Sequence, residues 1–212
     1  LLKITNLIDS NNLDILEIGP GSGKLTDHII LKKPNKLTLI EIDKDLVEDL
    51  KVKYSRLNYI KLVKANILEI NLRENYELVI SNLPYNISSQ IIVKLALLNK
   101  SPDRLILMFQ KEFAQRLLDK RINSINSLIR CFYDVNLSFN VSRNCFRPIP
   151  KVDSSVLVFS KKDKKLLRED EVNDFIIFKR QLFSHKRKSL KNLLKKYHLE
   201  KDFNLNLRVE NL

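Results

Sequence analysis

All three glycines of this 212-residue chain lie in one short segment, at positions 19, 21 and 23. The segment follows the apolar run 13–18 and precedes a stretch of helical character that begins at Lys24. Glycine is needed where the backbone takes a positive φ angle or where a ligand comes close to it. A strand, a glycine turn and a helix N-terminus in that order can bind a nucleotide-like ligand. The segment therefore predicts a nucleotide-binding loop.

The spacing of these glycines separates two kinds of loop. A dinucleotide-binding loop has the pattern G-x-G-x-x-G, and Lys24 stands where its third glycine would be. The observed pattern over 17–23 is E-x-G-x-G-x-G, which resembles the first motif of S-adenosylmethionine-dependent methyltransferases. Glu41 follows Gly23 by 18 residues, at the end of the apolar run 36–42. A carboxylate there can accept hydrogen bonds from both ribose hydroxyls of a nucleoside cofactor, whether NAD or S-adenosylmethionine.

The most specific motif follows the apolar run 77–81 and reads Asn82-Leu83-Pro84-Tyr85. It resembles the motif of methyltransferases that act on exocyclic amino groups of bases. The adenine N6 lone pair is delocalised into the ring, so N6 is a poor nucleophile. Acceptors for its two hydrogens, here the Asn82 side-chain oxygen and the Leu83 carbonyl, favour a pyramidal nitrogen. Pro84 stiffens the turn and has no N–H, and Tyr85 offers a flat face to an unstacked base.

The elements that must position these residues are predicted from hydrophobic pattern. Near-continuous apolar runs suit a parallel sheet that is covered on both faces, and their alternation with helical segments indicates a doubly wound α/β fold. The predicted strands are 13–18, 36–42, 58–63, 77–81 and 104–109, and the predicted helices are 24–32, 44–54, 88–99 and 111–120.

The pattern changes after residue 122. A helix near 123–132 precedes two strand-like runs, 134–142 and 154–160, which predict an antiparallel hairpin at the sheet edge. From 169 onward the sequence is basic and indicates helices without strands. We expect a Rossmann-like methyltransferase domain over 1–160 and a small helical RNA-docking domain over 161–212.

The charge of the chain favours a polyanionic partner. The formal net charge is +13 and the isoelectric point is near 9.7. Residues 161–201 contain fourteen Lys/Arg and six Asp/Glu, and this excess of 14 − 6 = +8 is more than half of the total. AT-rich coding is an alternative source of these lysines. The predicted RNA-binding residues are Lys186, Arg187, Lys188 and Lys191.

Several classes of protein are disfavoured. Cys131 and Cys145 form no C-x-x-C pair and the three histidines are scattered, so neither a disulfide framework nor a metal site is expected. No apolar run has the length of a membrane span, and no signal peptide is recognisable. We expect a cytoplasmic monomer. The chain begins at Leu1 without methionine, and a transit peptide in a missing N-terminal segment would make it organellar.

Four segments in this order resemble one family more closely than the superfamily. They are 82–88, 110–112, 146–154 and 186–192. Over roughly the whole chain the sequence resembles the small-subunit ribosomal RNA adenine N6,N6-dimethyltransferases, with large-subunit macrolide-resistance methyltransferases as relatives. Leu83, rather than isoleucine, favours the small-subunit branch.

The resemblance implies roles for individual residues. Asn82 and Tyr85 hold the target adenine, and Phe146 either stacks on its other face or is a core aromatic. Segment 151–154 is expected to be structural and to lead into the last strand. The cofactor-binding positions that it implies are Glu17, Gly19, Gly21, Glu41, Ile42, Asn66, Ile67 and Asn82.

The sequence departs from the family pattern at three places. Asn66 replaces the usual aspartate that accepts a hydrogen bond from the cofactor adenine, and it keeps an acceptor oxygen. The family's glycine near 120–128 is absent, and its upstream Gln-x-Phe-Leu segment is not in this chain.

The expected activity is transfer of a methyl group from S-adenosylmethionine to adenine N6, twice per base. The resemblance implies two adjacent adenines in a hairpin loop near the 3′ end of small-subunit rRNA, so the expected partner is the small ribosomal subunit. Methylation of a large-subunit adenine is the alternative within the class. A non-catalytic nucleic-acid-binding or assembly factor is another, against which the intact 82–85 motif argues. Lys24 and the lack of a candidate hydride-site histidine disfavour an NAD enzyme.

Overall fold

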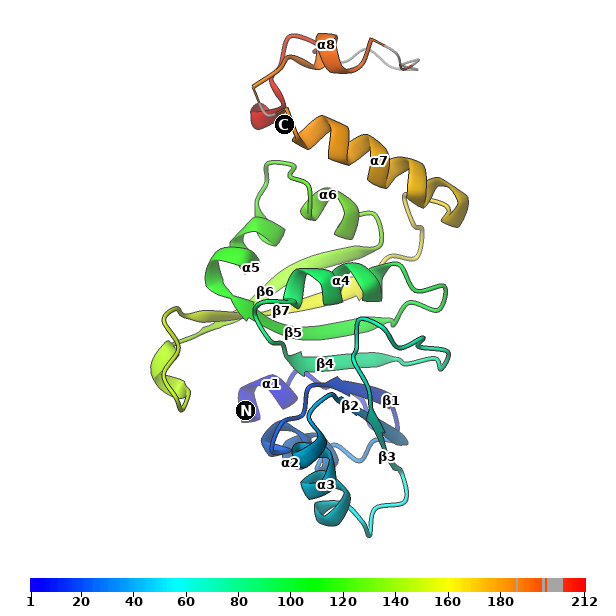
Figure 1. Ribbon diagram of the computed structural model, residues 1–212, viewed down its shortest axis with the longest axis vertical. Helices are drawn as coiled ribbons and strands as arrows, with labels where there is room; N and C mark the ends of the chain where they lie inside the picture. Colours follow the sequence, from blue (N-terminus) through cyan, green and yellow to red (C-terminus); the bar gives the residue numbers. More distant parts are fainter. Residues whose placement is uncertain (186, 196, 198–203) are drawn as a thin grey trace.

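A seven-stranded sheet forms the centre of the computed structural model, which describes residues 1–185, 187–195, 197 and 204–212. The strand order is β3-β2-β1-β4-β5-β7-β6, and β1 to β5 are parallel (Figure 1). β7 is antiparallel to both β5 and β6, which confirms the predicted hairpin at the sheet edge. The strands are β1 Asp14–Ile18, β2 Lys36–Glu41, β3 Ile60–Lys64, β4 Leu78–Asn82, β5 Arg104–Gln110, β6 Tyr133–Val141 and β7 Ser154–Lys161.

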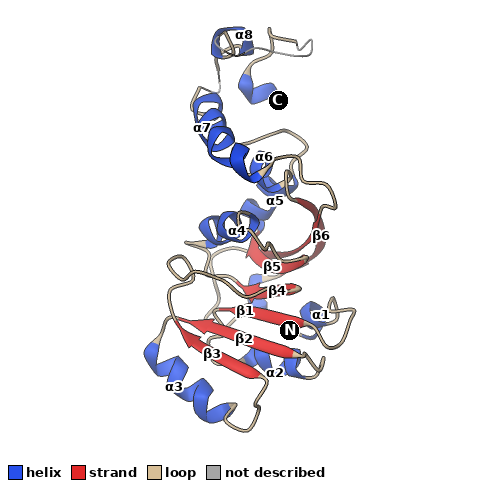
Figure 2. Ribbon diagram, turned by 90° about the vertical axis from the view of Figure 1, so that its right-hand side faces the viewer, coloured by secondary structure: helices blue, strands red, loops and turns tan. Residues whose placement is uncertain are grey.

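Helices cover both faces of the sheet, as the apolar strands require (Figures 1 and 2). Apolar side chains of α1, α2 and α3 form one core cluster with the sheet, and those of α4, α5 and α6 form the other. The four-residue helix α1 was not predicted. The helices are α1 Leu2–Thr5, α2 Lys24–Ile30, α3 Lys44–Lys53, α4 Ser88–Ala96, α5 Lys111–Leu118, α6 Asn126–Ile129, α7 Val172–Phe183 and α8 Leu190–Leu193.

The predicted helix over 123–132 was wrong in extent, because α6 spans only Asn126–Ile129. The Asn123 side-chain oxygen accepts hydrogen bonds from the N–H groups of Ile125 and Asn126, both at 3.0 Å. Such a side-chain bond offers the backbone an alternative to helix, so the chain turns before α6 begins.

The C-terminal part from residue 169 was predicted as basic and helical, without strands. The structure instead places short 3₁₀ helices at Glu169–Glu171 and Val209–Asn211, and it pairs Ser189 with Arg208 in an isolated antiparallel bridge. Val172 and Phe175 of α7 pack against the main core, whereas Leu182, Leu190 and Val209 gather in a separate apolar cluster. The division at residue 160 into two domains stays a prediction.

Candidate active site

The glycine segment joins the end of β1 to the start of α2. Gly19, Gly21 and Gly23 have φ angles of +64°, +57° and +78°. A Cβ at Gly23 would lie 2.3 Å from the Tyr54 hydroxyl oxygen, so no side chain fits there. By contrast, no atom lies within 4 Å of a Cβ built on Gly19 or Gly21. Open space beside a bare backbone is what a closely bound ligand requires.

A cavity of about 610 Å³ opens beside this loop. Five predicted site residues line it together: Glu17, Gly19, Gly21, Asn82 and Phe146. They come from the end of β1, the glycine turn, the end of β4 and the β6–β7 connection. The carboxyl ends of the parallel strands thus meet at one edge, where α/β sheets bind ligands. Seven predicted catalytic or cofactor-binding residues are not in the lining of this cavity: Glu41, Ile42, Asn66, Ile67, Leu83, Pro84 and Tyr85.

Glu41 contacts the glycine loop directly. Its carboxylate accepts hydrogen bonds from the N–H groups of Gly21 at 3.1 Å, Ile42 at 2.8 Å and Asp43 at 3.1 Å. A carboxylate offers about four acceptor positions. Three of these positions are therefore occupied by backbone N–H groups, which leaves the Glu41 carboxylate little capacity to accept from a ribose. Ribose binding by Glu41 stays a prediction.

The other predicted cofactor residues lie at strand ends near Glu41. The Ile42 side chain is 61% exposed, although it is large and apolar. Asn66 follows β3, and its side chain accepts from the N–H of Leu68 at 3.0 Å and donates to Glu69 at 2.7 Å. Ile67 is buried. An exposed apolar surface at Ile42 suits an aromatic ring of a ligand.

Glu17 is an unusual carboxyl group because it is only 1% exposed. Its Oε2 accepts a hydrogen bond from the Thr26 hydroxyl at 2.7 Å. Burial is the main reason that the pKa of Glu17 is raised to about 8. The hydrogen bond from Thr26 lowers this pKa. The nearby charges of Asp27 and Glu41 raise it, and that of Lys53 lowers it. Glu17 is therefore mostly protonated at neutral pH and ionises readily when a cation binds beside it.

The 82–85 motif is fixed by bonds to neighbouring strands. The Ser81 hydroxyl donates to the carbonyl of Ile18, which ties the end of β4 to the end of β1. The Tyr85 hydroxyl and the Ser154 hydroxyl lie 2.6 Å apart. Leu83 is buried, and Asn82 and Pro84 are exposed. In the part of the chain that the structure describes, the Asn82 side chain forms no hydrogen bond, so its oxygen is free to accept.

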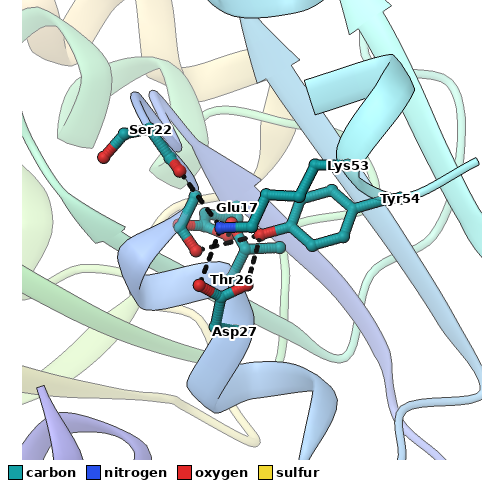
Figure 3. Close-up of polar contacts among 7 residues, drawn as sticks. Glu17, Ser22, Thr26, Asp27, Lys53 and Tyr54 are labelled. Atoms are coloured by element: carbon teal, nitrogen blue, oxygen red, sulfur yellow. Dashed lines mark hydrogen bonds and ion pairs between the residues drawn. The ribbon is translucent and has the colours of Figure 1, made fainter. Parts of the chain in front are cut away.

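A polar cluster on α3 was missed by the sequence analysis (Figure 3). The Tyr54 hydroxyl donates to the carbonyl of Gly23 at 2.9 Å and contacts an oxygen of Asp27 at 2.8 Å. Lys53 Nζ lies 2.7 Å from the other Asp27 oxygen and 3.3 Å from the carbonyl of Ser22. These bonds fasten the glycine turn to α3. Nothing in the local sequence marks them, because the partners are about thirty positions apart.

The predicted RNA-binding residues lie far from this cavity. Arg187, Lys188 and Lys191 are exposed around α8, and Lys186 lies outside the described residues. In both views α8 lies at the top of the molecule, whereas α2, which follows the glycine loop, lies in its lower half (Figures 1 and 2).

The sequence predicted neither a metal site nor a membrane-spanning segment. Within the described ranges, no three or more His, Cys, Asp or Glu side chains gather in a way that could hold a metal ion. No helix in the described part of the chain has the length and apolar character to cross a membrane.

Comparisons with solved structures define the class. A dimethyladenosine transferase from Plasmodium falciparum superposes with a TM-score of 0.81 and 30% identity, over 92% of this chain and 72% of that chain. The 23S rRNA methyltransferase ErmE superposes with a TM-score of 0.72 over 99% of this chain and 92% of its own; at 22% identity this shows the fold alone. The chain has the fold of S-adenosylmethionine-dependent methyltransferases.

Sequence comparison defines the family. The family described as ribosomal RNA adenine dimethylase matches residues 2–211. A "Ribosomal RNA small subunit methyltransferase A" of Mycoplasma capricolum is 40% identical, over 91% of this chain and 76% of that protein. A protein of the same name from Pelagibacter ubique is 38% identical, over 100% of this chain and 86% of its own. The chain belongs to the ribosomal RNA adenine dimethylase family, which confirms the resemblance, and its methyl donor is S-adenosylmethionine.

The cavity fits this donor. The open space beside the Cα atoms of Gly19 and Gly21 admits a ligand close to the backbone. Glu17 can ionise to a carboxylate beside a positively charged group. Bound there, S-adenosylmethionine supplies an electrophilic methyl group on a sulfonium.

The buried Glu17 predicts a pH dependence of stability. Its pKa is about 8 in the folded chain against an ordinary 4.5, so between these values the folded state binds more protons than the unfolded state. The free energy of unfolding then falls as pH rises, by up to about 1.4 kcal/mol per pH unit. Glu17→Gln keeps an acceptor for Thr26 and removes this titration. Urea unfolding should show wild type losing stability relative to the variant from pH 5 to pH 8; a constant difference would contradict the assignment.

The cluster on α3 predicts an effect on cofactor binding. Tyr54→Phe keeps the ring and removes the bonds to Gly23 and Asp27. A hydrogen bond is worth about 0.5–1.5 kcal/mol net, so we expect S-adenosylmethionine affinity to fall by about 2- to 10-fold in calorimetry. Tyr133→Phe is the matched control, because this fully buried hydroxyl donates to Pro102 at 2.7 Å on the far side of the sheet. It should reduce stability and leave affinity unchanged. Equal affinities in both variants would show that Tyr54 does not position the loop.

Proposed function

We propose that this protein dimethylates N6 of two adjacent adenines in a hairpin loop near the 3′ end of small-subunit rRNA. The observation that carries the proposal is the exposed Asn82 carboxamide, which forms no hydrogen bond in the described part of the chain and lines the same cavity as the glycine loop. An unpaired acceptor at that position has a place for a hydrogen-bond donor, and an exocyclic amino group is one.

In this proposal the chain's residues act by positioning and by polarisation. The Asn82 oxygen and the Leu83 carbonyl accept the two N6 hydrogens, so the nitrogen lone pair points out of the base plane. Acceptors that are already fixed in place stabilise the developing positive charge on N6. The Tyr85 ring, held by its hydroxyl contact to Ser154, provides a flat face for the adenine, and Phe146 provides the second face from the cavity wall.

The bonding changes need no strong base. The N6–carbon bond forms while the carbon–sulfur bond of the donor breaks, and the sulfonium electron pair returns to sulfur. The nitrogen is acidic while it carries the extra bond, so its proton passes to solvent. The same arrangement acts on the monomethylated base, which still has one N6 hydrogen for an acceptor.

The small subunit is favoured over the large subunit by the relatives with 38–40% identity, whose names specify small-subunit rRNA. A purely binding role would leave the unpaired Asn82 without a use. We further propose that the protein acts as a monomer in the cytoplasm and that residues 161–212 serve as its RNA-docking domain.

The decisive experiment supplies labelled S-adenosylmethionine and undermethylated ribosomal subunits and maps the modified nucleotides. Label on two adjacent adenines near the 3′ end of small-subunit rRNA is expected. Asn82→Ala should lower the rate by about 10²–10³ because one transition-state acceptor is lost, with S-adenosylmethionine affinity little changed. Asn99→Ala removes an exposed carboxamide after α4 and should leave the rate unchanged. Label in large-subunit rRNA, or more than a tenth of the rate in Asn82→Ala, would overturn the proposal.

The docking role of the C-terminal residues has its own test. Arg187, Lys188 and Lys191, replaced together by glutamine, remove up to three phosphate contacts. Each contact contributes about −0.7 to −0.9 to the slope of log K against log salt, so filter binding should show weaker RNA binding and a shallower slope. The control replaces Lys44, Lys64 and Lys100, three exposed lysines elsewhere, and makes the same change in net charge. An identical slope in both variants would place the docking surface elsewhere.

A further inference from the structure

Three basic side chains surround the cavity of the active site, and each comes from a different element. Lys3 belongs to α1, Lys24 is the first residue of α2, and Arg147 lies in the β6–β7 connection. All three line the cavity of about 610 Å³ and all three are exposed. These residues are distant in sequence, and the fold alone brings them together.

The positive charges have no counter-charge in the cavity. Within the described ranges, none of the three side chains forms an ion pair with a carboxylate. Arg147 donates to the carbonyls of Asn144 at 3.0 Å and Phe146 at 2.8 Å, which orient its guanidinium without neutralising it. Among the residues that the structure describes, Glu17 is the only carboxyl group in the lining. It is mostly uncharged at neutral pH because its pKa is raised to about 8.

The cofactor does not explain these cations. S-adenosylmethionine carries a sulfonium, an ammonium and a carboxylate, so its own net charge is +1. Three unpaired cations around the cavity therefore oppose its binding, since like charges repel in proportion to the inverse of their distance. A cavity that binds only this molecule would have been expected to carry acidic groups. The arrangement fits a second ligand that is an anion.

We propose that Lys3, Lys24 and Arg147 form a phosphate-binding rim that holds the RNA backbone on both sides of the target adenine. This inference rests on the proposed function. A base that enters the cavity has left its stack, while the phosphates on either side of it stay at the mouth. Lysine binds phosphate as a point charge and arginine binds it through two parallel N–H groups. The rim is separate from the residues around α8, because α8 lies at the top of the molecule and α1 and α2 lie in its lower half (Figure 1).

The rim also couples the two substrates. When RNA phosphates neutralise the three cations, the repulsion of the positively charged cofactor is relieved. RNA binding should therefore increase the affinity for S-adenosylmethionine, and by reciprocity the cofactor should increase the affinity for RNA by the same factor. The neutral product S-adenosylhomocysteine, which has lost the sulfonium charge, should show a smaller coupling.

The test uses Lys3→Gln, Lys24→Gln and Arg147→Gln, singly and combined, with the Lys44, Lys64 and Lys100 triple variant as the control of equal charge. Filter binding of undermethylated small subunits over a salt series should give a slope that is shallower by about 0.7–0.9 per rim residue. The control should keep the wild-type slope. Calorimetry without RNA should show S-adenosylmethionine affinity that is unchanged or higher in the rim variants.

Two outcomes would overturn the proposal of a phosphate-binding rim. An unchanged salt slope in the combined variant would show that these cations do not contact RNA. A lower S-adenosylmethionine affinity in Lys24→Gln would assign that lysine to the carboxylate of the cofactor instead. Because RNA binding is measured without turnover, a wild-type protein that binds RNA through the rim but methylates no rRNA would contradict the proposed function and leave the rim intact.

Discussion

The hydrogen bonds of the Glu41 carboxylate are the interactions on which the candidate site depends most. The carboxylate joins the end of β2 to the glycine turn after β1 through the N–H of Gly21, and it also accepts from the first two N–H groups beyond its own strand. Hydrogen bonds to an ionised acceptor are stronger than neutral ones. The turn is held on its other side by Tyr54 and Lys53. The open backbone at Gly19 and Gly21 is thus a rigid surface that is fixed before any ligand arrives.

The sequence predicted the parts of the site that local pattern encodes. Apolar runs located β1, β2 and β4. Glu17 and Asn82, which the family resemblance placed among the cofactor-binding positions, both line the cavity at the carboxyl ends of these strands. Residues whose role depends on tertiary contacts are not marked by any local sequence pattern. Tyr54 is an ordinary aromatic at the end of an amphipathic helix, and only the 2.3 Å approach to a Cβ at Gly23 reveals why both residues are needed.

Other features that the sequence did not reveal have the same physical origin. Ribose binding by Glu41 stays a prediction, and the sequence could not show that three backbone N–H groups already donate to this carboxylate. The helix predicted over 123–132 was too long because the side chain of Asn123 caps the turn before α6. Lys3 lies on a helix of only four residues, too short for a periodic pattern. Its place beside Lys24 and Arg147 follows from packing alone.

The charges of the cavity explain how one small space serves two ligands of opposite sign. Glu17 is buried behind the glycine loop and carries a negative charge only when a positive group compensates for its lost solvation. Lys3, Lys24 and Arg147 are exposed at the surface, where water solvates them when no anion is bound. The interior of the cavity therefore favours the cationic methyl donor, and the rim favours the anionic RNA strand.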